Sequence, residues 1–427
     1  MNITFMLGNG FDIGFKMPTR YEDFYPQYCV IIDKDNDNIK AFKQMLKNRN
    51  DDEQKKIIDW SDFEKAFGEH SADPSIENKA AYLERFEDFV RKFNEYLEDV
   101  EKCTNLSNSE AIVKMMENAC NTFYKIRKAD EDSINAFFRR FGADRNYNFV
   151  TFNYTKTVDN CYTALRQYLR TVNYRDVGSL VHIHGYIEEN MIVGVNDPSQ
   201  ITNADFASDP EVVAEIVKPQ QNSDARTAYE NAMKSVIDSS NVICVYGMSV
   251  GATDKKWWEY ISTWLSKSDT RILIILKHEE KYNKRFPFDQ KKFIDPLIET
   301  FIGFSSLPKA EKEKIRKQIY VGINNDVFAM DAFDRKAFEE IYPPKTNKED
   351  KKNHAHMDSG NIDETIRNLQ KGVEELRETE QKIERTREMT LAKLKGQEKM
   401  MYHLEAYKSA ADQVDRYNAE KPEITVV

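Results

Sequence analysis

Two short apolar runs in the second half of the chain restrict the fold more than any other feature. Residues 242–246 read Val-Ile-Cys-Val-Tyr and residues 272–276 read Ile-Leu-Ile-Ile-Leu, with no charged side chain in either run. Such near-continuous hydrophobicity is typical of strands that are buried on both faces of a parallel sheet. We therefore expect these two segments to form the middle of a sheet.

Similar short runs recur along the chain, and each is followed by a polar or helical stretch. This alternation predicts an α/β fold with a doubly wound, mainly parallel sheet and helices on both faces. The expected sheet domain comprises residues 1–20 and 145–340. Its expected strands are residues 3–7, 147–152, 180–183, 191–195, 241–246, 271–276 and 318–321.

Long segments outside the strands predict further helical parts. Residues 21–144 carry apolar side chains at i, i+3, i+4, i+7 spacing, which predicts a large helical insertion that acts as a lid or a partner surface. Residues 198–223 should form a loop with one short helix that closes over a ligand.

The C-terminal part of the sequence predicts a linker and a long helix. Residues 341–361 read as a charged linker, and residues 362–427 as a long helical tail with heptad-like spacing. We expect coiled-coil self-association through this tail, hence a homo-oligomer; packing on the body and an independent helix are the alternatives.

Composition narrows the partners and the compartment. The net charge of −10 argues against non-specific electrostatic binding to a phosphodiester backbone, so we do not expect nucleic acid to be a partner. Five cysteines without CxxC spacing, in a chain with no signal peptide pattern, predict reduced thiols in the cytoplasm, with neither disulfides nor zinc. No apolar run approaches the roughly 20 residues of a membrane helix, so we expect no membrane association.

A glycine turn follows the first expected strand. Residues 5–18 read FMLGNGFDIGFKMP, so an apolar strand runs into Gly8-Asn9-Gly10 and then into a helical segment. Glycines at such a turn allow a phosphate to approach backbone N–H groups, and the next helix offers its positive end. The alternative is a tight turn that needs glycine for geometry alone.

Polar side chains also follow two other expected strands. Asn153 ends the second strand, where it could donate and accept hydrogen bonds at a ribose, and Asn196 and Asp197 end the fourth. In open α/β sheets ligands collect at the carboxyl ends of strands. Asn153 could instead cap the helix that follows, but Thr155 is an equally good cap, which leaves Asn153 freer for a ligand.

Two histidines lie in the third expected strand, which reads Val-His-Ile-His-Gly. On a strand, His182 and His184 would share one face, and Gly185 would leave room beside the second ring. His184 is the stronger functional candidate because an imidazole at a strand end can take a proton at neutral pH. The alternative is a buried structural histidine, and no metal is expected because the pair lacks further ligands at suitable spacing.

The segment after the fifth expected strand breaks into small residues. Ser249 and Asp254 could hydrogen-bond a phosphate and a ribose, with a simple turn and an N-cap as the alternative reading. Gly247-Met248-Ser249-Val250-Gly251 also fits the letters of a serine-hydrolase elbow. That reading is disfavoured because His278, the only later histidine of the sheet domain, has no clear acid ahead of it.

Taken together, six blocks resemble the AbiH family of bacteriophage abortive-infection proteins, in the family's order from residue 3 to about 260. AbiH proteins in turn look like distant members of the sirtuin-like NAD-binding superfamily. The blocks are LGNGFDIGFKMPTRYEDF, WSDFE, FVTFNYTKT, VHIHGYI, IVGVND and YGMSVGATD.

The resemblance implies a phage-defence effector that binds NAD as its substrate and hydrolyses the nicotinamide–ribose bond when infection is sensed, with a phage component as trigger. It implies that His184 is the general base and that Asn153 holds water or the ribose. The sirtuin-like dinucleotide-holding positions fall on Gly8, Asn9, Gly10, Asp12, Gly247 and Ser249.

Two residues depart from the sirtuin-like pattern. Lys16 stands where that pattern has a glycine before its proline, so the loop over the cofactor should differ, and Asp12 keeps a second function open. Asp12 stands where that pattern has a serine, and a carboxylate repels a pyrophosphate unless a cation such as Lys16 or Arg20 neutralises it or it points at a ribose hydroxyl. The alternative function is therefore a non-catalytic module that senses a nucleotide or ADP-ribose, with the response carried by the helical parts. The sirtuin-like zinc cysteines are absent from the sequence, which disfavours protein deacetylation.

Overall fold

Six parallel strands form the centre of the fold in the computed structural model. The structure describes residues 1–51, 63–142, 144–172, 177–187, 189–221, 223–283 and 285–343. The strand order is β3-β2-β1-β4-β5-β6, and every neighbouring pair is parallel. The strands are β1 (Asn2–Leu7), β2 (Asn146–Thr151), β3 (Leu180–His182), β4 (Val242–Tyr246), β5 (Ile272–Lys277) and β6 (Ile319–Ile323). The predicted fold class is confirmed.

Both faces of the sheet are buried, as the apolar runs predict. Phe5 in β1 lies opposite Phe149 on one side and Cys244 on the other. Phe5 packs into one hydrophobic cluster and its neighbour Met6 into a second, because successive side chains of a strand point to opposite faces. The middle strands are β1 and β4, whereas the sequence predicted β4 and β5; β5 lies one place further out.

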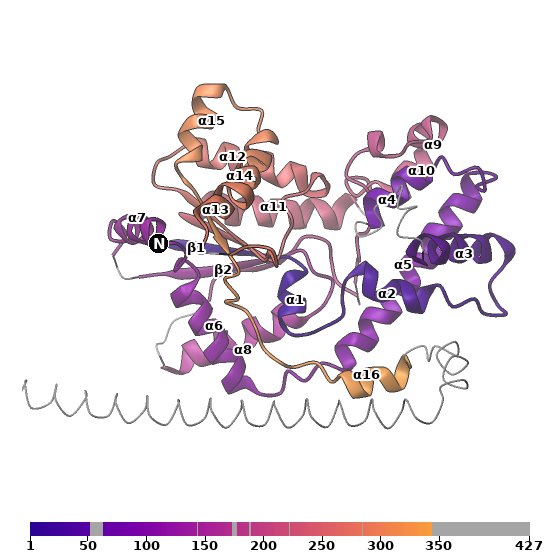
Figure 1. Ribbon diagram of the computed structural model, residues 1–427, viewed down its shortest axis with the longest axis horizontal. Coiled ribbons are helices and arrows are strands. Elements are labelled where there is room, and N and C mark those ends of the chain that lie inside the picture. The colour runs from indigo at the N-terminus through magenta and orange to yellow at the C-terminus, as the bar shows by residue number, and fades with distance from the viewer. Residues whose placement is uncertain are drawn as a thin grey trace, which may run out of the picture. The chain divides into compact units, whose positions relative to one another are not determined.

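Helices cover both faces of the sheet (Figure 1), with α6 and α8 on one face and α11, α12, α14 and α15 on the other. Because the strand order reverses between β1 and β4, the helices diverge there, and a crevice forms at the carboxyl ends of these two strands. The bounds are α6 (Ser109–Thr122), α8 (Thr157–Val172), α11 (Ser223–Ser239), α12 (Lys255–Ser266), α14 (Asp295–Gly303) and α15 (Lys309–Arg316).

The first helices of the insertion lie beyond the carboxyl ends of the strands, whereas its helix α6 covers one face of the sheet and its last helix lies beside the N-terminus (Figure 1). Its longest helix, α5, begins after Asn78, whose side chain accepts from the backbone N–H of Ala81 as an N-cap. Phe63 stacks on Phe89 of α5, and both rings belong to the same hydrophobic cluster as Phe5 of the sheet. The insertion therefore shares a core with one face of the sheet. Besides α6 it contains α2 (Tyr21–Tyr28), α3 (Asp37–Asp51), α4 (Phe63–His70), α5 (Lys79–Lys102) and α7 (Lys128–Phe138).

Two expectations for the middle of the chain are wrong. Residues 191–195 are apolar and largely buried but form no strand; Val195 makes only an isolated bridge to Val217, and Gly194 has a φ of 144°. The segment after them folds into three short helices rather than one. These are the 3₁₀ helix η2 (Pro198–Gln200), α9 (Ala204–Ser208) and α10 (Pro210–Ile216).

The remaining short helices are α1 (Gly10–Gly14), the 3₁₀ helix η3 (Ala252–Asp254), α13 (Pro287–Phe293) and α16 (Arg335–Ile341). All five cysteines are free and buried. Over the described residues, no helix has the length and apolar content needed to cross a bilayer. The predicted tail 362–427 and the predicted linker after residue 343 lie outside the described residues, as do residues 60–62 of the WSDFE block, so coiled-coil assembly stays a prediction.

Candidate functional site

A cavity of about 460 Å³ lies at the carboxyl ends of the strands, where the strand order reverses. Its walls come from the segments that follow β1, β2, β3 and β4 and from helices of the insertion. Segments far apart in the chain thus meet at one place. The predicted site residues that line it are Gly8, Asn9, Asp12, Asn153, His184, Gly247, Ser249 and Asp254.

Three predicted site residues are not among those that line the cavity. The Asn196 side chain donates to the backbone oxygen of Ala252 (3.1 Å), and the Asp197 carboxylate accepts from the backbone N–H of Ser199 (2.9 Å) as the N-cap of η2. Gly10 packs against the turn after β4. Asparagine and aspartate are common both in loops and at ligands, so sequence alone did not separate the two uses.

The glycine turn serves backbone packing between two strand ends. The N–H of Gly8 donates to Tyr246 O (3.0 Å) and that of Gly10 to Gly247 O (2.8 Å). A Cβ atom on Gly10 would lie 2.4 Å from the Cα of Gly247, and one on Gly8 would lie 2.3 Å from the Cγ of Met248. These two N–H groups are therefore already used, and the turn differs in this respect from the phosphate cradle that the sequence suggested.

Asn9 ties this turn to the start of the insertion. Its side-chain amide donates to the backbone oxygen of Thr19 (3.1 Å), and the Thr19 hydroxyl donates back to the Asn9 oxygen (2.5 Å). This pair fixes the segment before α2, where Arg20 and Tyr21 line the cavity. Lys16, between the two, has a φ of 67°, a backbone conformation that glycine adopts at lower cost.

Asp12 is a buried carboxyl group at the base of the cavity. Its Oδ2 accepts a hydrogen bond from the Thr155 hydroxyl (2.7 Å), rather than an ion pair from Lys16 or Arg20, as the sequence suggested. Its Oδ1 is buried without a hydrogen-bond partner. Burial raises the pKa of Asp12 from 3.8 to about 7, against the lowering effect of Thr155, so this carboxyl group is protonated in part of the molecules near neutral pH.

Asn153 places its side-chain amide beside this carboxyl group, where it lowers the pKa of Asp12 against the effect of burial. The residue is 5% exposed, and both the oxygen and the nitrogen of its side chain are buried without a hydrogen-bond partner. Its backbone N–H donates to the Thr151 hydroxyl (3.1 Å), which fixes the turn after β2. Buried amides are normally satisfied, so an unused pair of donor and acceptor lining a cavity is what a ligand or water would complete.

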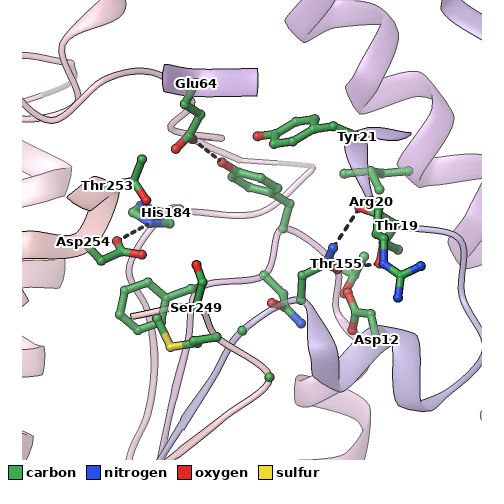
Figure 2. Close-up of a pocket in the computed structure, with 18 of the residues that line it drawn as sticks. Asp12, Thr19, Arg20, Tyr21, Glu64, Thr155, His184, Ser249, Thr253 and Asp254 are labelled. Carbon is green, nitrogen blue, oxygen red and sulfur yellow. Dashed lines mark hydrogen bonds and ion pairs between the residues drawn. The ribbon is translucent and has the colours of Figure 1, made fainter. Parts of the chain in front are cut away.

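His184 reaches the cavity from the end of β3, while His182 does not line it. The strand stops at His182, so the predicted alternation does not extend to both rings, and His182 instead lies 2.9 Å from Asp159 in α8. The Nε2 of His184 is 3.6 Å from Oδ1 of Asp254 (Figure 2), and its Nδ1 has no hydrogen-bond partner. Burial, and next the ammonium group of Lys218, hold the pKa of His184 below its usual value, which favours the neutral imidazole.

An ion pair in the cavity wall was missed from the sequence. Lys218, the second residue after α10, lies 2.7 Å from Oε2 of Glu64 in α4, and both side chains are buried. The Tyr154 hydroxyl lies 3.3 Å from Oε1 of Glu64. Glu64 stands in the WSDFE block, which was a usable signal; Lys218 stands in an ordinary loop sequence with none.

Ser249 lines the cavity without the partners of a serine hydrolase. Its side chain is exposed, and His278, the only later histidine of the sheet domain, is also exposed and faces Asp326 at 3.9 Å. Neither His278 nor Asp326 lines the cavity. The elbow-like sequence therefore forms a turn, and Ser249 and Thr253 are hydroxyl groups in the cavity wall.

Comparison with known proteins identifies the family. The search of curated proteins finds no match. A family model described as bacteriophage abortive infection AbiH matches residues 4–276, which is more than half of the chain. The match includes all of β2, β3 and β4, most of β1 and β5, and every residue of the cavity wall named above. The chain therefore belongs to the AbiH family of bacteriophage abortive-infection proteins.

Proposed function

We propose that the cavity binds NAD and that the protein hydrolyses its nicotinamide–ribose bond as the effector step of abortive infection. The observation that carries the proposal is the meeting of His184, Asn153 and Asp12 in one cavity, each with a buried polar atom that lacks a hydrogen-bond partner. Unused buried donors and acceptors are costly unless a ligand or water satisfies them. The sirtuin-like resemblance of the sequence blocks supplies the identity of the ligand.

The volume of the cavity and the exposed Arg20 in its wall suit part of a dinucleotide. Its volume of about 460 Å³ falls in the range of roughly 300–1,000 Å³ that is usual for small-molecule sites. Arg20 and Ser249 are exposed residues of its wall, so they can meet a pyrophosphate that extends toward solvent. The reacting end of the ligand would then lie deeper, beside His184.

The chemistry follows from a neutral imidazole and a free amide. His184, whose lowered pKa keeps it neutral, accepts a proton from water as the water oxygen bonds to C1′ of the ribose. The C1′–N bond breaks, and nicotinamide leaves as a neutral molecule with the bonding electron pair. The products are ADP-ribose, nicotinamide and one proton, which His184 returns to solvent. Asn153 orients the water or the ribose through its two unused side-chain atoms.

The protonation of Asp12 removes an objection to a dinucleotide. An ionised carboxylate would repel a pyrophosphate, but with a pKa of about 7 the group can keep its proton when a negative ligand enters. Its Oδ1 could then donate to the ligand.

One residue also favours the sensing alternative. Asp12 stands where the sirtuin-like pattern has a serine, and its carboxyl group is still ionised in part of the molecules near neutral pH. In this second function, the cavity holds a nucleotide or ADP-ribose without turning it over, and the helical parts carry the response.

Release of nicotinamide from NAD by the purified full chain tests the first proposal. We expect release by the wild type, with or without phage lysate as trigger, and loss of at least a hundredfold in His184→Ala and Asn153→Ala, since general-base catalysis contributes about 10²–10⁴-fold. His182→Ala is the matched control, because His182 is two residues away and does not line the cavity.

The outcomes separate the alternatives. Binding of NAD or ADP-ribose without release, even with lysate, would support the sensing module. Equal release by the wild type and the two site variants would refute the roles given to His184 and Asn153.

A further inference from the structure

The buried ion pair in the cavity wall joins helix α4 of the insertion to the segment after α10, and Oε1 of Glu64 also accepts from the backbone N–H of Gly194 (3.4 Å). The Nζ atom of Lys218 lies 2.7 Å from Glu64, and the two side chains are 2% and 9% exposed. Burying two charges costs about as much as their attraction returns, so such a pair is a weak source of stability. Its position beside His184 in the same cavity suggests a role in the site.

A continuous set of contacts leads from this pair to His184. The Tyr154 hydroxyl lies within hydrogen-bonding distance of Glu64 Oε1 (3.3 Å) and of the backbone oxygen of Ile192 (3.2 Å). The N–H of Ile192 donates to the backbone oxygen of His184 (2.8 Å), and the Tyr154 and His184 rings are 6.3 Å apart. Glu64 thus holds both the ammonium group of Lys218 and, through Tyr154, the segment that orients the imidazole.

The charged groups that face His184 come from three different segments. Lys218 opposes protonation of the ring, whereas Asp254 in η3 and Glu64 in α4 favour it. Tyr154 adds no charge, because burial, and next Glu64, raise the pKa of its hydroxyl well above 10. After burial, Lys218 is the largest influence on the pKa of His184, and it acts downward.

We propose that the Glu64–Lys218 ion pair positions and polarises His184, which makes helix α4 of the insertion a working part of the site. Lys218 keeps the imidazole neutral and able to accept a proton, and Glu64 fixes the ammonium group in place. Both are positioning residues, since they act through His184. The inference deepens the function proposed above, because it concerns the group to which that function assigns the proton transfer.

The titration of the His184 ring tests this directly. Histidine-selective ¹³C labelling of the full chain gives each ring a signal, and the signal that disappears in His184→Gln is assigned to His184. We expect Lys218→Met, which keeps the length of the side chain and removes its charge, to move the titration midpoint of His184 to higher pH. Lys218→Arg, which keeps the charge, should stay closer to the wild type.

A second buried ion pair, which lies entirely within the insertion, provides the matched control. Lys43 lies 2.9 Å from Asp35, with side chains 3% and 6% exposed, and neither residue lines the cavity. Lys43→Met should lower stability as Lys218→Met does while leaving the His184 midpoint unchanged. An unchanged midpoint in Lys218→Met, or an equal shift in Lys43→Met, would overturn the proposal.

If Lys218→Met does not fold, the double variant Glu64→Gln/Lys218→Met replaces it, because no lone charge remains buried. We expect a smaller upward shift, since the influence of Lys218 on His184 exceeds that of Glu64; an unchanged midpoint would again overturn the proposal. The readout needs no NAD, so absence of nicotinamide release would refute the hydrolase and leave this test standing.

Discussion

Replacing Asp12 with asparagine should stabilise the protein, and the gain should grow with pH. Burial raises the pKa of Asp12 from 3.8 to about 7, so the folded protein holds this proton more tightly than the unfolded chain does. Below about pH 4 both states carry the proton and the group has no effect. Between about pH 4 and pH 7 only the folded state keeps it, so stability falls as the pH rises, and above pH 7 the full cost of a buried carboxylate applies.

The magnitude follows from the same two values. One pKa unit corresponds to about 1.4 kcal/mol, so the carboxyl group costs about 2 kcal/mol at pH 5 and about 4 kcal/mol at pH 8. Asp12→Asn removes this cost and keeps an oxygen for the Thr155 hydroxyl, at a loss of about 1 kcal/mol for a weaker hydrogen bond. We expect the variant to be more stable than the wild type by about 1 kcal/mol at pH 5 and about 3 kcal/mol at pH 8.

Urea unfolding at the two pH values, followed by tryptophan fluorescence, measures the difference. Asp35→Asn is the control, and its effect should have the opposite sign. Burial alone would raise the pKa of Asp35, but the hydrogen bond and the charge of Lys43 lower it. The Asp35 carboxylate therefore stabilises the fold at pH values above the pKa that it has in the unfolded chain. A stability gain for Asp12→Asn that does not change with pH, or a loss at pH 8, would refute the account of a strained, buried carboxyl group.

Three other substitutions test the geometry of the cavity. Gly10→Ala should destabilise the fold by at least about 1–3 kcal/mol in urea unfolding, because its Cβ would meet the backbone of Gly247 at 2.4 Å; a neutral effect would show that the two turns separate easily. Tyr154→Phe should lower the free energy of unfolding by about 1 kcal/mol, because the hydrogen bond to Glu64 is lost. If calorimetry gave the variant the same unfolding temperature as the wild type, this hydrogen bond would be refuted. Arg20→Ala should weaken ADP-ribose binding about tenfold in titration calorimetry while a nucleoside without phosphate is unaffected; equal weakening of both would remove Arg20 from phosphate contact.

The sheet could be predicted because the apolar composition of its inner strands indicates that both of their faces are buried. Residues 242–246 and 272–276 are apolar at every position that a doubly covered sheet buries, and both form inner strands. Residues 191–195 are just as apolar and were expected to be a strand. Their segment is buried by its surroundings instead, and Gly194 at a φ of 144° interrupts the extended backbone. Apolar sequence thus indicated burial correctly but not the backbone conformation.

Some residues of the site could likewise be predicted from the sequence, and others could not. Asn153 and His184 were recognisable because each follows a strand whose carboxyl end faces the cavity. Asn196 has the same chemistry, but its side chain donates to the backbone oxygen of Ala252 in η3, a long-range contact that no local sequence pattern predicts. Glu64 and Lys218 are 154 residues apart, and no local sequence pattern predicts that two charged residues so distant in the chain form a buried ion pair.

The turns after β1 and β4 form the floor of the cavity and pack closely against each other, which restricts how this part of the cavity can change. Neither Gly10 nor Gly247 can gain a side chain unless the opposite backbone moves, so this floor can hardly change one residue at a time. Arg20 and Tyr21, at the start of the insertion, already carry side chains in the cavity wall, and Arg20 is exposed. Over evolutionary time, relatives of this protein should therefore keep one common floor while exchanging wall residues singly, and new ligand preferences would arise from the wall.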